Sequence, residues 1–138
     1  MNDLVIWHKN NPIPLRNRLT NSFEFIWILS KHPIGKYYVD EYIHNVWDIP
    51  VSSGVNGHSA TFPLELPVRC IKYFSKEGDT VLDPFMGSGT VGVACKQLNR
   101  NFIGIEINKD YLSLSKDRID KFNIDGCEND VPDTVKLW

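Results

Sequence analysis

The clearest pattern of apolar and polar residues lies in the second half of the chain. A short apolar strand at 80–82 leads into a glycine-rich turn, where a helix begins. Residues 102–106 form a continuous apolar run that ends in an acid, which predicts a buried parallel strand. Asn108 then precedes a helix as its cap, and the apolar residues of that helix keep a roughly helical period; they are Tyr111, Leu112, Leu114, Ile119 and Phe122. This alternation of strands and helices predicts an α/β fold.

The other segments show weaker patterns. Residues 66–74 form an amphipathic stretch, and residues 47–50 predict a strand or turn that packs against the body of the protein. The segment 32–57 is rich in loops and glycines, so its aromatic side chains are expected to pack more often than to stack on bases; they are Tyr37, Tyr38, Tyr42 and Trp47. Residues 123–138 are acidic and irregular, and 134–138 either add one edge strand or dock loosely.

The turn after the first of these strands carries the candidate chemistry. Residues 83–90 read Asp-Pro-Phe-Met-Gly-Ser-Gly-Thr. The segment 87–92 satisfies G-x-G-x-x-G, and Glu106 follows Gly87 by about 20 residues. On spacing alone this is a dinucleotide fingerprint whose acid binds a ribose hydroxyl. A purely structural turn, in which Asp83 caps the backbone, is the alternative that needs no ligand.

The charge of Asp83 argues against a dinucleotide. A pyrophosphate seeks the positive end of a helix and its free N–H groups, whereas Asp83 would place a negative charge beside it in a poorly solvated turn. S-adenosylmethionine (SAM) instead carries an ammonium and a sulfonium group, which Asp83 would attract, and ribose hydroxyls that can donate to Glu106. The chain after Gly92 is also too short to form a second mononucleotide-binding half. We therefore expect SAM as the cofactor.

Composition limits the alternatives. A chain of 138 residues with 42% apolar content fits one domain, and its net charge of −2 is not the clearly basic balance of a general DNA binder. No apolar run approaches the ~20 residues that span a bilayer and no secretory leader is visible, so a cytoplasmic location without a membrane partner is expected. The three cysteines and four histidines lack ligand spacing, which predicts reduced thiols and no metal.

Several segments together resemble the DNA amino-methyltransferases, which methylate N6 of adenine or N4 of cytosine. Residues 78–90, followed by 101–106 and Tyr111, look like motifs I and II of that family. Residues 58–63, which read His-Ser-Ala-Thr-Phe-Pro, are similar to motif X, which packs over the methionine end of SAM. The segments 5–12 and 23–31 resemble the β-hairpin region of motif VIII. The motif order is the permuted one, in which the catalytic motif and the target-recognition segment precede motifs X and I.

The resemblance implies a SAM-dependent, Rossmann-like α/β sheet and a specific set of cofactor contacts. The residues that would surround the amino-acid part of SAM all lie in the turn; they are Asp83, Phe85, Met86, Gly87, Ser88, Gly89 and Thr90. Glu106 would hold the ribose. Thr61, Phe62 and Pro63 would complete the wall of the pocket.

DNA is the implied substrate, and the basic residues near the N-terminus are candidates to contact it. Residues 1–36 contain more lysines and arginines than acids. Phosphate contacts are expected from four of these residues, because each would release counterions from the duplex; they are Lys9, Arg16, Arg18 and Lys36. An exposed hairpin end with no ligand is the alternative for each of them. The segment at 32–57, where the family has its target-recognition region, is too short for a separate recognition domain.

The catalytic tetrapeptide of the family, Asp/Asn/Ser-Pro-Pro-Tyr/Phe, does not occur in the 138 residues. An exocyclic amine is a poor nucleophile because its lone pair is delocalised into the base. In the family, this tetrapeptide accepts the hydrogens of the amine and its aromatic residue stacks on the flipped base. The sequence therefore assigns no catalytic residue of its own. The strand that carries the tetrapeptide would pair with the strand at 80–82, so that strand should have an unpaired edge.

These observations predict one partial methyltransferase domain. Its parts are a hairpin region at 1–31, a short recognition-like segment at 32–57, the SAM-binding part at 58–122 and a tail or edge strand at 123–138. The expected function is that of the SAM-binding C-terminal part of a DNA methyltransferase, completed by a partner chain that carries the catalytic motif or by self-association. The alternative is a truncated, inactive remnant or an interaction module that keeps the scaffold.

Overall fold

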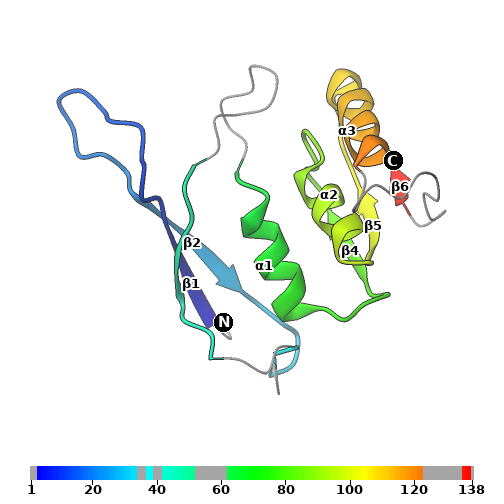
Figure 1. The fold of residues 1–138 in the computed structure, drawn as a ribbon, viewed down its shortest axis with the longest axis horizontal. Coiled ribbons are helices and arrows are strands. Elements are labelled where there is room, and N and C mark those ends of the chain that lie inside the picture. Colours follow the sequence, from blue (N-terminus) through cyan, green and yellow to red (C-terminus); the bar gives the residue numbers. More distant parts are fainter. Residues whose placement is uncertain (1–2, 34–36, 39–41, 52–61, 123–134, 138) are drawn as a thin grey trace.

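Two small sheets lie on either side of a helix. The computed structural model describes residues 3–33, 37–38, 42–51, 62–122 and 135–137. Within them the strand orders are β2-β1-β3 in one sheet and β4-β5-β6 in the other. Helix α1 (Glu65–Phe74) lies between the two sheets (Figure 1).

The first sheet contains the hairpin expected near the N-terminus. Strand β1 (Asp3–His8) pairs antiparallel with β2 (Phe23–Ile28) and parallel with β3 (Val46–Asp48). The strand or turn expected at 47–50 is therefore a short edge strand, and its Trp47 is buried. The inward residues of this sheet form a core with one face of α1; they are Val5, Trp7, Trp47 and Ile49.

The opposite face of this sheet is largely apolar, with His8 and Asp48 at one end of it, and its β2 side chains are exposed. The register places Leu4 opposite Trp27 and Ile6 opposite Phe25. Phe25 and Trp27 are 52% and 57% exposed, and their rings lie against each other with centroids 6.3 Å apart. One-sided burial is common in antiparallel sheets, but the exposed side then normally carries polar residues. This surface, formed by Leu4, Ile6, Phe23, Phe25, Trp27 and Val46, is called the outer apolar face below.

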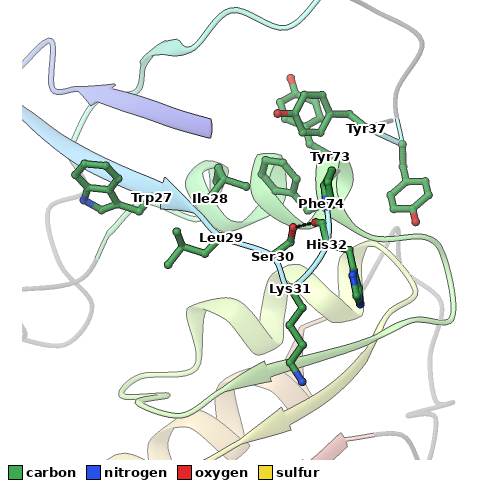
Figure 2. Close-up of a pocket in the computed structure, with 11 residues that line it drawn as sticks. Trp27, Ile28, Leu29, Ser30, Lys31, His32, Tyr37, Tyr73 and Phe74 are labelled. Atoms are coloured by element: carbon green, nitrogen blue, oxygen red, sulfur yellow. Dashed lines mark hydrogen bonds between the residues drawn. The ribbon is translucent and has the colours of Figure 1, made fainter. Parts of the chain in front are cut away.

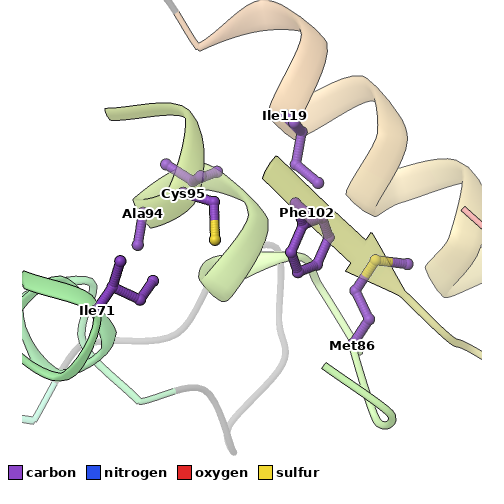
Figure 3. Close-up of a cluster of buried hydrophobic side chains, with 7 residues drawn as sticks. Ile71, Met86, Ala94, Cys95, Phe102 and Ile119 are labelled. Carbon is purple, nitrogen blue, oxygen red and sulfur yellow. The ribbon is translucent and has the colours of Figure 1, made fainter. Parts of the chain in front are cut away.

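The second sheet is parallel throughout. Strand β4 (Thr80–Asp83) pairs with β5 (Asn101–Gly104), which pairs with β6 (Val135–Leu137). Helices α2 (Thr90–Gln97) and α3 (Lys109–Lys121) complete the α/β unit. Figure 3 shows its core, to which α2, α3, β5 and the turn after β4 contribute; the members include Met86, Ala94, Cys95, Phe102 and Ile119.

Strand β4 has one strand partner among the described residues, which is β5. Its other edge is unpaired there, and Leu82 in this strand is 58% exposed. This agrees with the unpaired edge that the missing tetrapeptide strand predicts.

Helix α1 connects the two cores because it buries two faces. Leu66, Cys70 and Tyr73 pack against the first sheet, while Ile71 lies in the core of the second. The amphipathic stretch that the sequence indicates at 66–74 is thus apolar on two sides. No helix in the described ranges is long and apolar enough to cross a bilayer.

Candidate cofactor site

Two loops meet at the carboxyl ends of β4 and β5. Asp83 is the last residue of β4, and Glu106 lies two residues beyond the end of β5, outside the strand that the sequence predicts to reach it. Backbone hydrogen bonds join the loops: Ile105 N donates to Asp83 O, and Met86 N donates to Ile105 O, both at 2.9 Å. The two acids are therefore held at one edge of a parallel sheet, where α/β proteins bind ligands.

The turn between β4 and α2 depends on glycine. Gly89 has φ of +78° and is the N-cap of α2. A Cβ atom on Gly89 would lie 2.9 Å from Cβ of Ser115 in α3. Both the left-handed backbone and the close approach of α3 exclude a larger residue without strain.

Asp83 is half-buried and its ionised form is disfavoured. Burial raises the pKa of its carboxyl, and repulsion from Glu106 raises it further, while a hydrogen bond from Phe85 N (3.0 Å to Oδ1) acts in the opposite direction. Neither Asp83 nor Glu106 forms an ion pair with a described lysine, arginine or histidine. The site therefore holds two carboxylates that a cation would stabilise.

Glu106 connects the two loops through its side chain. Its Oε2 accepts from Gly87 N at 2.8 Å, and its Oε1 accepts from Asn108 N at 2.9 Å. Each carboxylate oxygen can accept a second hydrogen bond, so Glu106 keeps acceptor capacity for a diol. Asn108 caps α3 as the sequence predicts, since its side chain accepts from Asp110 N and Tyr111 N.

The other predicted turn residues face in different directions. Phe85 is 88% exposed, whereas Met86 is buried in the core below the turn. Ser88 and Thr90 are also buried, and their hydroxyls accept hydrogen bonds from Arg118 of α3.

The predicted pocket wall is only partly described. Phe62 and Pro63 lie just before α1, which begins at the same edge of the molecule as the turn before α2 (Figure 1). Thr61 lies outside the described residues.

Sequence reasoning missed Arg118. No motif spacing marks it, because its role depends on how α3 packs behind the turn. The signal available in the sequence was its place in the last turn of a helix, one position before the buried Ile119.

The candidate DNA contacts differ in their surroundings. Arg16 and Arg18 are exposed in the loop between β1 and β2. This loop extends beyond its sheet toward the same edge of the molecule as the start of α2, which lies on the other side of α1 (Figure 1). Lys9 instead pairs with Glu24, and its amine lies 5.2 Å from the centroid of the Trp7 ring. Lys36 lies outside the described residues.

One cavity lies beside β2, away from the turn. It has a volume of about 590 Å³ and lies between the end of β2 and the end of α1, as Figure 2 shows for Trp27, Leu29 and Phe74. β2 is an edge strand of its sheet in the described part of the chain. The cavity is thus part of the surface beside an open sheet edge, and it contains neither Asp83 nor Glu106.

The cysteines and histidines of the described segments form no group that could hold a metal ion. Cys70 and Cys95 are free, and burial raises their pKa values to about 11 and about 12. Neither thiol is poised to act as a nucleophile near neutral pH. Cys127 lies outside the described residues.

Comparisons with known proteins place the chain. It belongs to the N6/N4 family of DNA methylases, whose family profile matches residues 1–117. The Type II methyltransferase M.Cfr9I of Citrobacter freundii is 39% identical over 130 residues, which are 83% of this chain and 43% of that protein. M.SmaI of Serratia marcescens is 41% identical over 132 residues, 83% of this chain and 44% of that protein. The chain thus spans less than half the length of these relatives.

Solved structures agree on the fold. A crystal structure of an M1.HpyAVI–SAM complex superposes with a TM-score of 0.69 at 38% identity, over 85% of this chain and 61% of that one. The fold is that of the SAM-dependent DNA methyltransferases, present in this chain as an incomplete Rossmann-like sheet.

Proposed function

We propose that this chain is the SAM-binding part of a DNA methyltransferase that modifies N6 of adenine or N4 of cytosine. The observation that carries the proposal is the pair of partly buried carboxylates, Asp83 and Glu106, at the ends of adjacent parallel strands. An anionic ligand would be repelled from this edge, whereas a ligand with cationic groups and a diol matches both acids. Family membership supplies the reaction class.

Each acid would have a distinct task in cofactor binding. Asp83 would face the positive groups of the amino-acid part, and Glu106 would accept from the ribose hydroxyls while it keeps Gly87 N and Asn108 N bonded. When bound, SAM supplies an electrophilic methyl group on sulfonium. The chain positions that group and needs neither a metal nor a covalent enzyme intermediate for the transfer.

The groups that activate the target amine would come from another polypeptide. The family tetrapeptide is absent from the sequence, and β4 has an open edge, among the described residues, where the strand carrying it would pair. The outer apolar face and the cavity beside β2 would also be covered by that polypeptide, because apolar surface of this kind is rarely left open to water. We infer a separate complementary chain, so that the enzyme is split. A catalytically inactive remnant that keeps the scaffold is the competing proposal.

DNA would lie along the edge that carries the turn. Arg16 and Arg18 are exposed on the β1–β2 loop at this edge and can contact phosphates. Lys9 would contribute less, because Glu24 already pairs with its amine. Lys36 remains a candidate from its position in the sequence.

Calorimetry on the isolated chain tests the cofactor assignment. SAM is expected to bind and NAD is not. Glu106→Gln should weaken SAM binding about tenfold or more, since it removes the charge and leaves one acceptor oxygen in place of two. Glu77→Gln is the matched control. Glu77 precedes β4, and its side chain accepts a hydrogen bond from Asn99, not from a residue of the turn. Equal SAM affinity in wild type and Glu106→Gln would overturn the assigned pocket.

Reconstitution separates the split enzyme from the remnant. The probe is the part of M.Cfr9I outside its match to this chain, mixed with this chain, tritiated SAM and DNA. Methyl transfer that needs both polypeptides supports the split enzyme. Transfer by this chain alone would contradict the absence of a catalytic centre, and SAM binding without transfer in any mixture would favour the remnant.

A further inference from the structure

Helix α3 forms the support on which the SAM turn rests. The backbone of Gly89 approaches α3 so closely that an added Cβ would lie 2.9 Å from Ser115 Cβ and 3.3 Å from Ile119 Cδ1. Ser115 and Ile119 are fully buried at this contact. The position of the turn is therefore set from behind by one face of α3.

One side chain of α3 forms polar contacts with the turn. Arg118 Nη1 donates to Ser88 O and Ser88 Oγ, each at 3.2 Å, and to Thr90 Oγ1 at 3.0 Å. A nitrogen with two hydrogens thus serves three acceptors on both sides of Gly89. Because Ser88 and Thr90 are only 7% and 4% exposed, their hydroxyls point into the protein and not into solvent at the sheet edge.

Charge alone does not explain a benefit of Arg118 to the proposed cofactor. The guanidinium stays protonated in a protein, and it would repel the ammonium and sulfonium of SAM while it attracts the carboxylate. Nη1 of Arg118 already donates to Ser88 and Thr90. A benefit to binding is therefore expected from the geometry that Arg118 imposes on the turn.

We infer that Arg118 is a positioning residue for cofactor binding. It holds the turn from the α3 side through its hydrogen bonds to Ser88 and Thr90. The two hydroxyls are then occupied by Arg118, and the backbone of the turn is the part that faces SAM. This inference rests on the proposed SAM site. It assigns Ser88 and Thr90 a different task from the ligand contacts that the motif implies.

Two variants separate geometry from charge. Arg118→Met removes both the bonds and the charge, while Arg118→Lys keeps the charge but lacks the planar fork. Calorimetry with SAM should show about a tenfold loss of affinity for Arg118→Met and a smaller loss for Arg118→Lys. The loss is expected because Arg118→Met leaves the buried carbonyl of Ser88 and the hydroxyls of Ser88 and Thr90 without their donor. Lys121→Met is the control and should bind like wild type, because Lys121 lies on the same helix and its ion pair within the described residues is with exposed Asp117. Tighter SAM binding by Arg118→Met would overturn the inference, since it would show that charge alone acts.

Amide hydrogen exchange in the ligand-free chain keeps the inference separate from the proposed function. Exchange at 87–90 should speed up in Arg118→Met and in Thr90→Val, while exchange in β5 stays at the wild-type rate. If wild type fails to bind SAM but the turn responds in this way, the proposed function fails and the positioning role stands. Unchanged exchange at 87–90 would overturn the positioning role. If Arg118→Met does not fold, Thr90→Val removes one acceptor and provides the same readout.

Discussion

Asp83 would be under opposite demands from folding and from the proposed cofactor binding. Without ligand, its half-buried carboxylate lies near Glu106 and has no described basic partner, so burial and repulsion raise its pKa. A cationic ligand would reverse the balance by stabilising the ionised form. The carboxylate proposed to bind SAM is therefore one whose ionised form lowers the stability of the ligand-free fold.

Asp83→Asn should consequently stabilise the ligand-free chain and weaken SAM binding. The asparagine oxygen can still accept from Phe85 N, so the turn is kept. Near neutral pH the melting temperature should rise, while SAM affinity in calorimetry falls about tenfold, the typical effect of removing a bond to a charged group. A variant with both lower stability and unchanged affinity would contradict this account of Asp83.

The stability of the chain should depend on pH through the ionisation of Asp83. The pKa of Asp83 is higher in the folded chain than in the unfolded chain, where it is about 3.9. The contribution of neutral Asp83 to the free energy of unfolding is therefore fully present below the unfolded-state pKa and is lost as pH rises through the folded-state pKa. The melting temperatures of wild type and Asp83→Asn should therefore be similar in strong acid and diverge as pH rises. SAM affinity of wild type should increase over the same interval, since only ionised Asp83 attracts the ligand.

For single residues, the sequence predicted which positions belong to the site better than it predicted where their side chains point. The turn, its two acids and the Asn108 cap could be read from motif spacing and local chemistry. The burial of Met86 and the inward hydroxyls of Ser88 and Thr90 could not, because the packing of α3 decides them. Arg118 was missed for the same reason.

Helix α2 packs through Gly92 against β5 and α3. An added Cβ at Gly92 would lie 2.9 Å from Phe102 Cε1 and closer still to Ile119 Cδ1. The third glycine of the G-x-G-x-x-G pattern thus allows helix, strand and α3 to approach, whatever the ligand.

Gly92→Ala should therefore destabilise the chain by about 1–3 kcal/mol, as overpacking does in cores, although alanine is the better helix former. Thermal and urea unfolding measure this change. Ser113→Ala on the exposed side of α3 is the matched helix control and should be neutral or slightly stabilising. A stabilised Gly92→Ala would show that Ile119 and Phe102 can shift without cost.

The exposed arginines of the β1–β2 loop should contribute to the salt dependence of DNA binding. Replacing Arg16 or Arg18 with glutamine in the reconstituted enzyme should reduce the slope of log affinity against log salt by about 0.9 for each phosphate that the variant no longer neutralises. Lys121→Gln, at the C-terminal end of α3, is the control. Identical slopes for all variants would remove the loop from the DNA interface.

The hydrophobic pattern predicted the bounds of helices and strands well where the element packs into a single core. The helix at 109–121 and the strand at 80–83 agree closely with the pattern. The strand at 101–104 ends before Glu106, because the loop there bonds back to the turn through Ile105. The two-sided burial of α1 could not be read from a single amphipathic stretch.

On the scale of the whole molecule, the two sheets of the described residues lie on either side of α1 and share no strand pairing there. The resemblance predicted an incomplete sheet, since it identified the absent catalytic strand from the absent tetrapeptide. The cavity beside β2 and the extent of the outer apolar face could not be predicted, because they depend on which strand edges are left open.

The isolated chain should accordingly self-associate through its open apolar surfaces. Sedimentation velocity is expected to show dimers or larger species that increase with concentration. Trp27→Lys on the outer apolar face should shift the distribution toward monomer, whereas Ser113→Lys on α3 should not. A monomeric wild type at all concentrations would argue against these surfaces as sites of association.

The open edge of β4 also bears on how long the chain would survive in a cell. A polypeptide with unpaired strand edges and exposed aromatic rings is a substrate for chaperones and proteases. If the proposed complementary chain exists, we expect excess copies to be degraded until it protects them, which would match the abundance of one chain to that of the other. Methylation capacity would then be set by whichever chain is made in the smaller amount.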